Sequence, residues 1–119
     1  MDCPFAEIAE LDKLVHEPAR LAILTALAAC SSTDFLFLQR LTGLTKGNLS
    51  AHLSKLEEAG LVQIQKRFIG KVPNTQVSLT RAGRDSVERH WQQLESLHRD
   101  VQQWQAPTTQ DAVLCPAQE

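Results

Sequence analysis

The sequence predicts a mainly α-helical domain that carries one small β-hairpin, and three observations support this prediction. Apolar residues recur at three- and four-residue steps over most of the chain. The period changes to strict alternation in two short segments separated by turn residues. A chain of 119 residues with 43% hydrophobic content can bury one core but is too short for two ordinary domains.

The first expected helix covers residues 5–15. Its apolar side chains follow helical spacing, with acidic residues between them, and are Phe5, Ile8, Leu11, Leu14 and Val15. The segment His16-Glu17-Pro18 interrupts this helix, because the residue before a proline avoids helical torsions. Proline is favoured in a first helical turn, so a second helix is expected over residues 18–29.

Residues 31–34 are polar and predict a turn, with a brief strand at residues 34–35 as an alternative entry to a short helix over residues 35–41. Gly43 follows that helix as a left-handed cap, and Thr45 offers a hydroxyl to cap a helix over residues 46–59. Two helices joined by a short glycine-containing turn are typical of a helix-turn-helix unit.

A β-hairpin is expected next. Val62 and Ile64 alternate with glutamines, and Val77 and Leu79 alternate with polar residues in the same way. The turn residues between the two strands are Gly70, Pro73 and Asn74, which predict a hairpin with a long tip.

Thr80 is placed to cap a last helix over residues 81–104, whose apolar stripe is broader than one small domain can cover. We therefore expect the first and last helices to act as dimerisation helices, with an interface formed by Phe5, Ile8, Leu11, Val15, Val87, Trp91, Leu94, His98 and Val101. A cavity for an aromatic effector, lined by Trp91 and Trp104, is the alternative to this packing. The domain is expected over residues 1–104, followed by a flexible C-terminal tail over residues 105–119.

Charge is unevenly distributed along the chain. The net charge is −2, which alone argues against a nucleic-acid binder. Residues 46–84, however, hold seven basic residues against two acidic ones, and the segments on both sides are acidic. A basic middle segment favours one surface that binds a polyanion and other surfaces that face protein or solvent.

Four segments, in order, resemble those of ArsR- and MarR-type winged-helix regulators. They are residues 11–27, with the string His16-Glu17-Pro18-Ala19-Arg20, residues 44–62, residues 66–71 and residues 77–84. These segments are similar to the opening helix, the recognition helix with the next strand, the wing, and the Leu-Thr-x-x-Gly step into the last helix. The resemblance covers about residues 11–100 and is closest to a compact MarR-related group of stand-alone winged-helix proteins.

The resemblance implies a sequence-specific, double-stranded-DNA-binding transcription repressor that acts as a homodimer on a pseudo-palindromic operator. Its recognition helix, about residues 46–59, would enter the major groove, and its wing, about residues 66–76, would contact flanking backbone or the minor groove. A winged-helix protein-interaction module without DNA binding is the alternative. Metal-sensing ArsR members carry cysteine pairs or Asp/His sites. Cys30 stands alone here, and His90 and His98 lack a matching acidic pattern, so no metal site is implied.

Within this frame, the outward positions of the recognition helix and the basic wing residues are the candidate DNA contacts. They are Thr45, Lys46, Gly47, Asn48, Ser50, Ala51, Ser54, Lys55, Lys66, Arg67 and Lys71. Asn48 is suited to an adenine edge, and the lysines are suited to phosphates. His52 lies at the edge of the buried stripe, where it either lines the core or bonds a phosphate.

Enzymatic, secreted and membrane classes are disfavoured. The sequence has no glycine-rich phosphate loop, no paired ligand histidines and no supported Ser-His-Asp set, so we expect no enzymatic activity and no cofactor. The acidic start lacks a secretory signal and no long apolar run follows, so we expect a cytoplasmic protein. Three widely spaced cysteines favour reduced thiols, with Cys30 buried. The sequence identifies no small-molecule effector.

Overall fold

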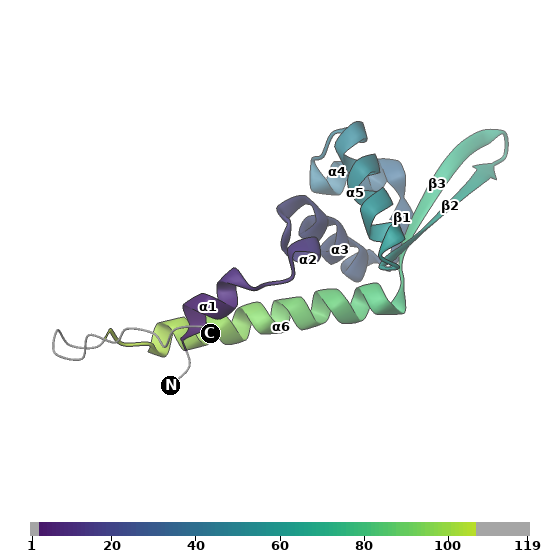
Figure 1. The fold of residues 1–119 in the computed structure, drawn as a ribbon. Coiled ribbons are helices and arrows are strands. Elements are labelled where there is room, and N and C mark those ends of the chain that lie inside the picture. Colours follow the sequence, from purple (N-terminus) through teal and green to yellow (C-terminus); the bar gives the residue numbers. More distant parts are fainter. Residues whose placement is uncertain (1–2, 107–119) are drawn as a thin grey trace.

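The computed structural model describes residues 3–106 as a mainly helical domain with a small antiparallel sheet (Figure 1). The elements, in order, are α1 (Pro4–Ala9), α2 (Lys13–His16), α3 (Pro18–Cys30), β1 (Ser32–Asp34), α4 (Phe35–Thr42), α5 (Lys46–Glu58), β2 (Val62–Ile69), β3 (Val72–Leu79) and α6 (Arg81–Gln103). The predicted fold class is confirmed. All of the predicted tail except its first two residues lies outside the described residues.

The prediction of one helix over residues 5–15 is wrong, because this segment forms two short helices, α1 and α2. The backbone N–H of Glu10 donates to the Glu7 carbonyl at 3.1 Å and closes α1. The Asp12 carboxylate then accepts from the backbone N–H of Leu14 at 2.9 Å and caps α2. A carboxylate at an N-cap satisfies a donor that the first helical turn leaves free, so Asp12 starts a new helix instead of continuing the first.

The sheet has three antiparallel strands in the order β1-β3-β2. Residues 31–34, predicted as a turn with a brief strand at residues 34–35, supply β1 over Ser32–Asp34. β1 pairs with β3 only from Ser32 opposite Ser78 to Asp34 opposite Gln76. Beyond that short stretch, β2 and β3 continue alone as a two-stranded ribbon.

This ribbon, which we call the wing, has a tight turn and not the predicted long tip. Pairing continues to Ile69 opposite Val72, which leaves only Gly70 and Lys71 in the turn. Gly70 has a φ of +64°, a conformation that favours glycine and that suits the first central position of a two-residue hairpin turn. Pro73 is tolerated within β3 because β1 does not pair with β3 at that register.

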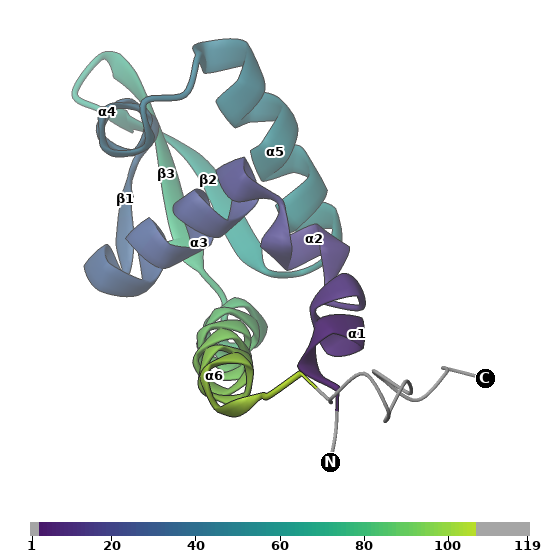
Figure 2. The ribbon, with the colours of Figure 1, turned by 90° about the vertical axis from the view of Figure 1, so that its left-hand side faces the viewer.

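The core lies between α3, α4, α5 and the base of the sheet. Its most completely buried side chains include those of Ile23, Leu24, Leu27, Leu38, Leu49, Leu56 and Val77. Figure 2 views α6 end-on, with α3 above it and α1 beside it. Within residues 3–106, no helix is long and apolar enough to cross a membrane.

Burial corrects several predictions from the sequence. Leu11, Val15 and Val87, predicted to face a partner, are buried within a single chain because α2, α3 and the first half of α6 pack together. Cys30 is exposed and not buried, because it is the last residue of α3. Cys3 is disulfide-bonded, so the prediction of reduced thiols is wrong for this residue.

Candidate nucleic-acid interface

The helix-turn-helix unit is formed by α4, a three-residue turn and α5. Gly43 ends α4 in the left-handed conformation with φ 71°, and its N–H donates to the Gln39 carbonyl at 2.9 Å. The Thr45 hydroxyl then accepts from the backbone N–H of Asn48 at 3.2 Å and caps α5. The role of Thr45 predicted from helix capping is confirmed, and it fixes where the recognition helix starts.

Three leucines of α5, Leu49, Leu53 and Leu56, are buried, which turns the opposite side of the helix outward. The candidate contact residues of α5 are all exposed, and they are Lys46, Gly47, Asn48, Ser50, Ala51, Ser54 and Lys55. With about 100° of rotation per residue, Gly47, Ala51 and Ser54 are the candidate contacts that lie farthest from the buried leucines. These side chains are small, so the backbone of α5 can approach a flat or grooved partner closely.

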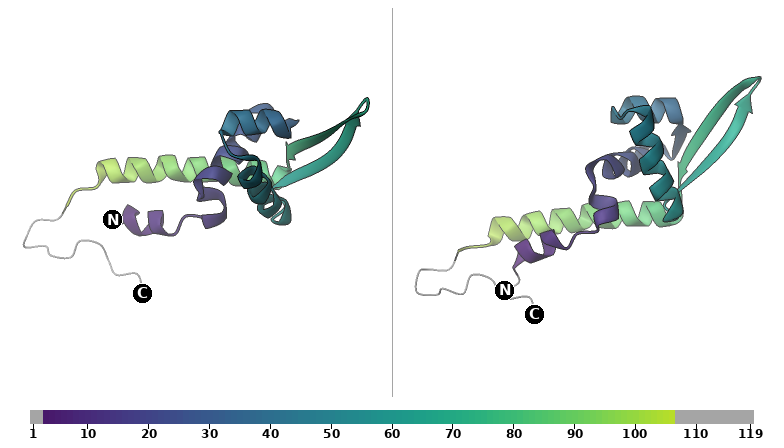
Figure 3. Two further views of the ribbon diagram at one scale, coloured as in Figure 1. Left: turned by 90° about the horizontal axis from the view of Figure 1, so that it is seen from above. Right: turned by 45° about the horizontal axis from the view of Figure 1, so that its top comes forward.

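A groove runs between α5 and the wing. Its polar lining comes from both elements and comprises Lys46, Ser50, Ser54, Glu57, Lys66, Asn74 and Thr75. Lys46 and Lys66 are twenty residues apart in the sequence, and only the packing of the wing against α5 brings them to one groove. Figure 3 shows the wing diverging from α5 toward its tip.

The three candidate wing cations lie on different sides of the ribbon. Lys66 is opposite Thr75 and lines the groove, whereas Arg67, the next residue of β2 and opposite Asn74, does not line it. The Arg67 Nε donates to Asn74 Oδ1 at 3.1 Å, and its Nη2 donates to Gln76 Oε1 at 3.0 Å. Two of the Arg67 donors are therefore occupied by hydrogen bonds within the wing. Lys71 lies in the turn and is exposed.

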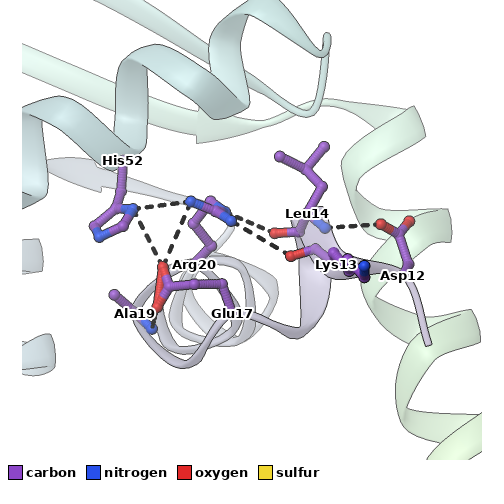
Figure 4. Close-up of polar contacts among 7 residues, drawn as sticks. All are labelled: Asp12, Lys13, Leu14, Glu17, Ala19, Arg20 and His52. Atoms are coloured by element: carbon purple, nitrogen blue, oxygen red, sulfur yellow. Dashed lines mark hydrogen bonds and ion pairs between the residues drawn. The ribbon is translucent and has the colours of Figure 1, made fainter. Parts of the chain in front are cut away.

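A partly buried polar cluster that the sequence analysis missed joins α5 to α2 and α3 (Figure 4). The Arg20 guanidinium donates from Nε to the Leu14 carbonyl at 2.7 Å and from Nη2 to the Lys13 carbonyl at 3.3 Å. Its Nη1 lies 3.2 Å from His52 Nδ1 and 3.5 Å from Glu17 Oε2, and the latter two atoms are 3.3 Å apart. Arg20 thus connects the first two residues of α2, the start of α3 and the middle of α5.

This cluster supports the inward alternative for His52. The imidazole is partly buried and its Nδ1 lies beside Glu17 and Arg20, so His52 joins α5 to α3. The spacing of Glu17 and Arg20 is a helical i, i+3 pair that the sequence reveals. Their partner His52 is 32 residues from Arg20, and no local signal connects it to them.

The comparisons with known proteins agree with this geometry. The family model for the winged helix DNA-binding domain matches residues 19–98. The chain belongs to this family. It is 30% identical to an uncharacterized protein of Methanocaldococcus jannaschii, over 76% of this chain and 98% of that protein.

Solved structures place the chain among regulators. It resembles a transcriptional regulator homologue from Pyrococcus horikoshii with a TM-score of 0.74 and 30% identity, over 82% of this chain and 96% of that one. It also resembles a MarR-family transcriptional regulator from Silicibacter pomeroyi, with a TM-score of 0.59 and 25% identity, over 83% of this chain and 66% of that one. The protein is therefore a winged-helix DNA-binding transcription regulator of the MarR type.

Two tryptophans of this winged-helix regulator have separate environments. Trp91 donates from Nε1 to the Thr25 hydroxyl at 3.0 Å and borders an apolar groove along α3. Trp104 packs edge-on against Phe5, with ring centroids 5.0 Å apart. Thirteen residues of helix separate the two rings by roughly 20 Å. The alternative of one effector cavity lined by both is therefore wrong.

A histidine pair joins the winged-helix core to α6. His16 Nδ1 and His90 Nε2 lie 2.9 Å apart, a contact in which one ring donates and the other accepts. Burial of His90 lowers the pKa of its imidazole from the ordinary value of 6.5. The nearby His16 lowers that pKa further, and Asp12 opposes the shift. Among residues 3–106, no group of three or more His, Cys, Asp or Glu side chains is arranged to hold a metal ion.

The lowered pKa of His90 predicts an acid-sensitive fold. The unfolded chain takes up a proton on this residue near pH 6.5, whereas the folded chain does so only at lower pH. The stabilising contribution is therefore complete above pH 6.5 and is lost as the pH falls below it. Urea midpoints should drop between pH 7.5 and pH 5.5, and they should drop less in His90→Gln. The control Arg89→Gln alters an exposed residue of the same helix, outside the predicted dimer interface, and should follow the wild type. Equal pH dependence in all three proteins would exclude His90 as the cause.

Proposed function

We propose that this regulator represses transcription by binding double-stranded DNA as a homodimer. In this proposal α5 enters the major groove, and the wing contacts the flanking backbone or the minor groove. The observation that carries it is the exposed, small and polar outer side of α5, which shares a groove with the basic wing. An α-helix fits the major groove, whose base edges distinguish all four base pairs. We further propose that the protein has no enzymatic activity and acts in the cytoplasm. The DNA-binding and dimerisation domain in this proposal spans residues 1–104.

In this proposal different residues make different contacts with the duplex. Lys46, Lys55, Lys66 and Lys71 carry exposed ammonium groups suited to phosphates, whereas Asn48, on the first turn of α5, is suited to a base edge. The wing Arg67 retains donors beyond the two that bond Asn74 and Gln76, since a guanidinium carries five N–H groups.

The dimer interface in this proposal is formed by α1 and the second half of α6. α1 packs alongside α6, and its Phe5 and Ile8 remain 44% and 43% exposed. With the three core residues removed, the predicted interface is reduced to Phe5, Ile8, Trp91, Leu94, His98 and Val101. A two-fold dimer presents two α5 helices, so the operator should contain two pseudo-palindromic half-sites about 34 Å apart.

Binding should weaken steeply as salt rises, because neutralised phosphates release counterions. We expect Lys55→Ala and Lys71→Ala each to lower affinity for all duplexes alike and to reduce the salt slope by about one unit. Arg89→Ala is a matched control, because Arg89 is exposed on α6 beyond the charged middle segment. Fluorescence anisotropy with duplexes selected from a random pool measures all four proteins. A wild type without salt-dependent binding would favour a protein-interaction module instead.

Asn48→Ala should relax sequence preference without changing the salt slope. If the amide reads a base, its loss costs on the order of 1–3 kcal/mol on the preferred site and little on random DNA. The cap on α5 is preserved, because Thr45 accepts from the backbone N–H of residue 48. Competition binding with specific and random duplexes separates the two effects, and equal losses on both would show that Asn48 only positions the protein.

A further inference from the structure

The tip of the wing carries an apolar surface that the contacts proposed above do not use. Phe68, Ile69 and Val72 are 71%, 58% and 66% exposed. Soluble proteins rarely leave adjoining large apolar side chains bare unless a partner covers them. Since β2 is an edge strand of the sheet, a bare apolar ribbon also invites aggregation through its unpaired edge. The tip is therefore a candidate binding surface.

The strand register places these side chains on both faces of a narrow ribbon. Phe68 is opposite Pro73, on the face that carries Lys66, and Ile69 is opposite Val72, on the other face. From residue 66 to residue 75 the ribbon has two strands only, because β1 pairs no further along β3 than Gln76. Four residues of strand reach about 14 Å beyond the base of the sheet. Figures 1 and 3 show this ribbon extending away from the helices.

The charges around the tip indicate the chemistry of the partner. Residues 66–75 include Lys66, Arg67 and Lys71 and contain no acidic residue. Lys71 lies in the turn, and Lys66 and Arg67 precede the apolar residues along β2, so basic side chains lie at both ends of the apolar surface. This arrangement fits a partner that has phosphates on both sides of a less polar surface. The minor groove of duplex DNA has this arrangement, because sugars and base edges lie between two phosphate backbones. The groove shared by Lys66 and α5 places the tip on the same side of the domain as the recognition helix.

We propose that the tip of the wing is an apolar wedge that enters the minor groove next to the α5 site and bends the duplex. This inference rests on the proposed function. The two strands of the ribbon lie about 4.8 Å apart, with side chains on both faces, whereas the minor groove is about 6 Å wide. The tip can enter only if the groove widens, and apolar side chains stabilise the partly unstacked base steps that widening produces. Flexible pyrimidine–purine steps deform at low cost, so the wing selects them at this position without reading base edges.

The test uses the full chain and two tip variants, Phe68→Ala and the double variant Ile69→Thr/Val72→Thr, which keeps β-branched side chains and makes them polar. All three positions are exposed, so the urea midpoint should be unchanged. Energy transfer between dyes at the two ends of a bound duplex reports bending. We expect the wild type to bring the ends closer and both variants to lose most of this change. Affinity should fall on the order of tenfold while the salt slope stays the same.

Two controls separate the wedge from charge and from general surface effects. Lys71→Ala is the control for charge and should reduce the salt slope. Leu41→Ala is the control for general surface effects. It removes a 50% exposed side chain on α4, outside the wing, and should have no effect on bending. A wild type that binds a straight duplex, with Phe68→Ala of equal affinity, overturns the wedge and leaves the proposed function standing. A wild type that binds no duplex overturns both. Loss of the dimer in Phe68→Ala, measured by light scattering, would assign the tip to a second copy of the chain and overturn the wedge.

Discussion

Replacing Gly83 with alanine is expected to destabilise the fold by about 3 kcal/mol, a large part of the stability of a small domain. Gly83 is buried in the first turn of α6, where its N–H donates to the Thr80 hydroxyl at 3.0 Å. A Cβ at this position would overlap the backbone carbonyl of Leu61 and lie 2.8 Å from the Cδ1 of Leu79. The Leu61 carbonyl is itself fixed, because it accepts the Thr80 N–H at 3.0 Å. Backbone cannot move aside as a flexible side chain can, so the strain remains.

Gly47 provides the matched control for this substitution. It also lies in the first turn of a helix, but a Cβ there would meet no atom within 4 Å. Gly47→Ala should therefore stabilise the fold by up to about 1 kcal/mol, because alanine favours the helix more than glycine does. Urea denaturation followed by circular dichroism measures both variants. Equal midpoints for the two proteins would contradict the close approach of α6 to Leu61.

Replacing Leu94 with glutamate should dissociate the dimer and abolish tight DNA binding together. Leu94 is half-buried on the part of α6 that extends beyond the winged-helix core, so the proposed partner covers what one chain leaves open. An unpaired carboxylate in that interface costs several kcal/mol, about 3–5 for a buried charge without a partner. Each half-site then binds alone, and the loss of two-site binding should lower affinity for the full operator by about 10²-fold.

The control for Leu94→Glu is Gln93→Glu, which adds the same charge at the neighbouring exposed position. Light scattering and DNA affinity measured on the same samples should show wild type and Gln93→Glu as dimers and Leu94→Glu as a monomer. A wild type that is monomeric at micromolar concentration would exclude this interface, and so would a dimeric Leu94→Glu protein. Retention of the fold is checked by the helical signal in circular dichroism.

Local sequence signals were sufficient for the helix-turn-helix unit. Gly43, Thr45 and the leucines of α5 predict the end of one helix, the cap of the next and its buried side, and the structure confirms each. These features depend on one residue and its neighbours within a turn, because capping and helical periodicity act over three or four positions. The same signals failed where short elements compete. Asp12 starts a new helix, and the turn signals of Pro73 and Asn74 are overridden by strand pairing.

Only the tertiary structure decided which apolar residues belong to the core and which surfaces face outward. Leu11, Val15 and Val87 have the spacing of an interface but are buried by α3 and α6, because burial depends on packing between distant segments. The contacts of His52 with Glu17 and Arg20, and of His16 with His90, likewise join residues that no periodicity relates. The sequence by itself determined the helix-turn-helix unit, the hairpin, the last helix and the outward side of α5. The fold determined what holds α5 in place, because those contacts join segments far apart in the chain. It left the apolar tip of the wing exposed, because β1 pairs with β3 only at the base of the ribbon.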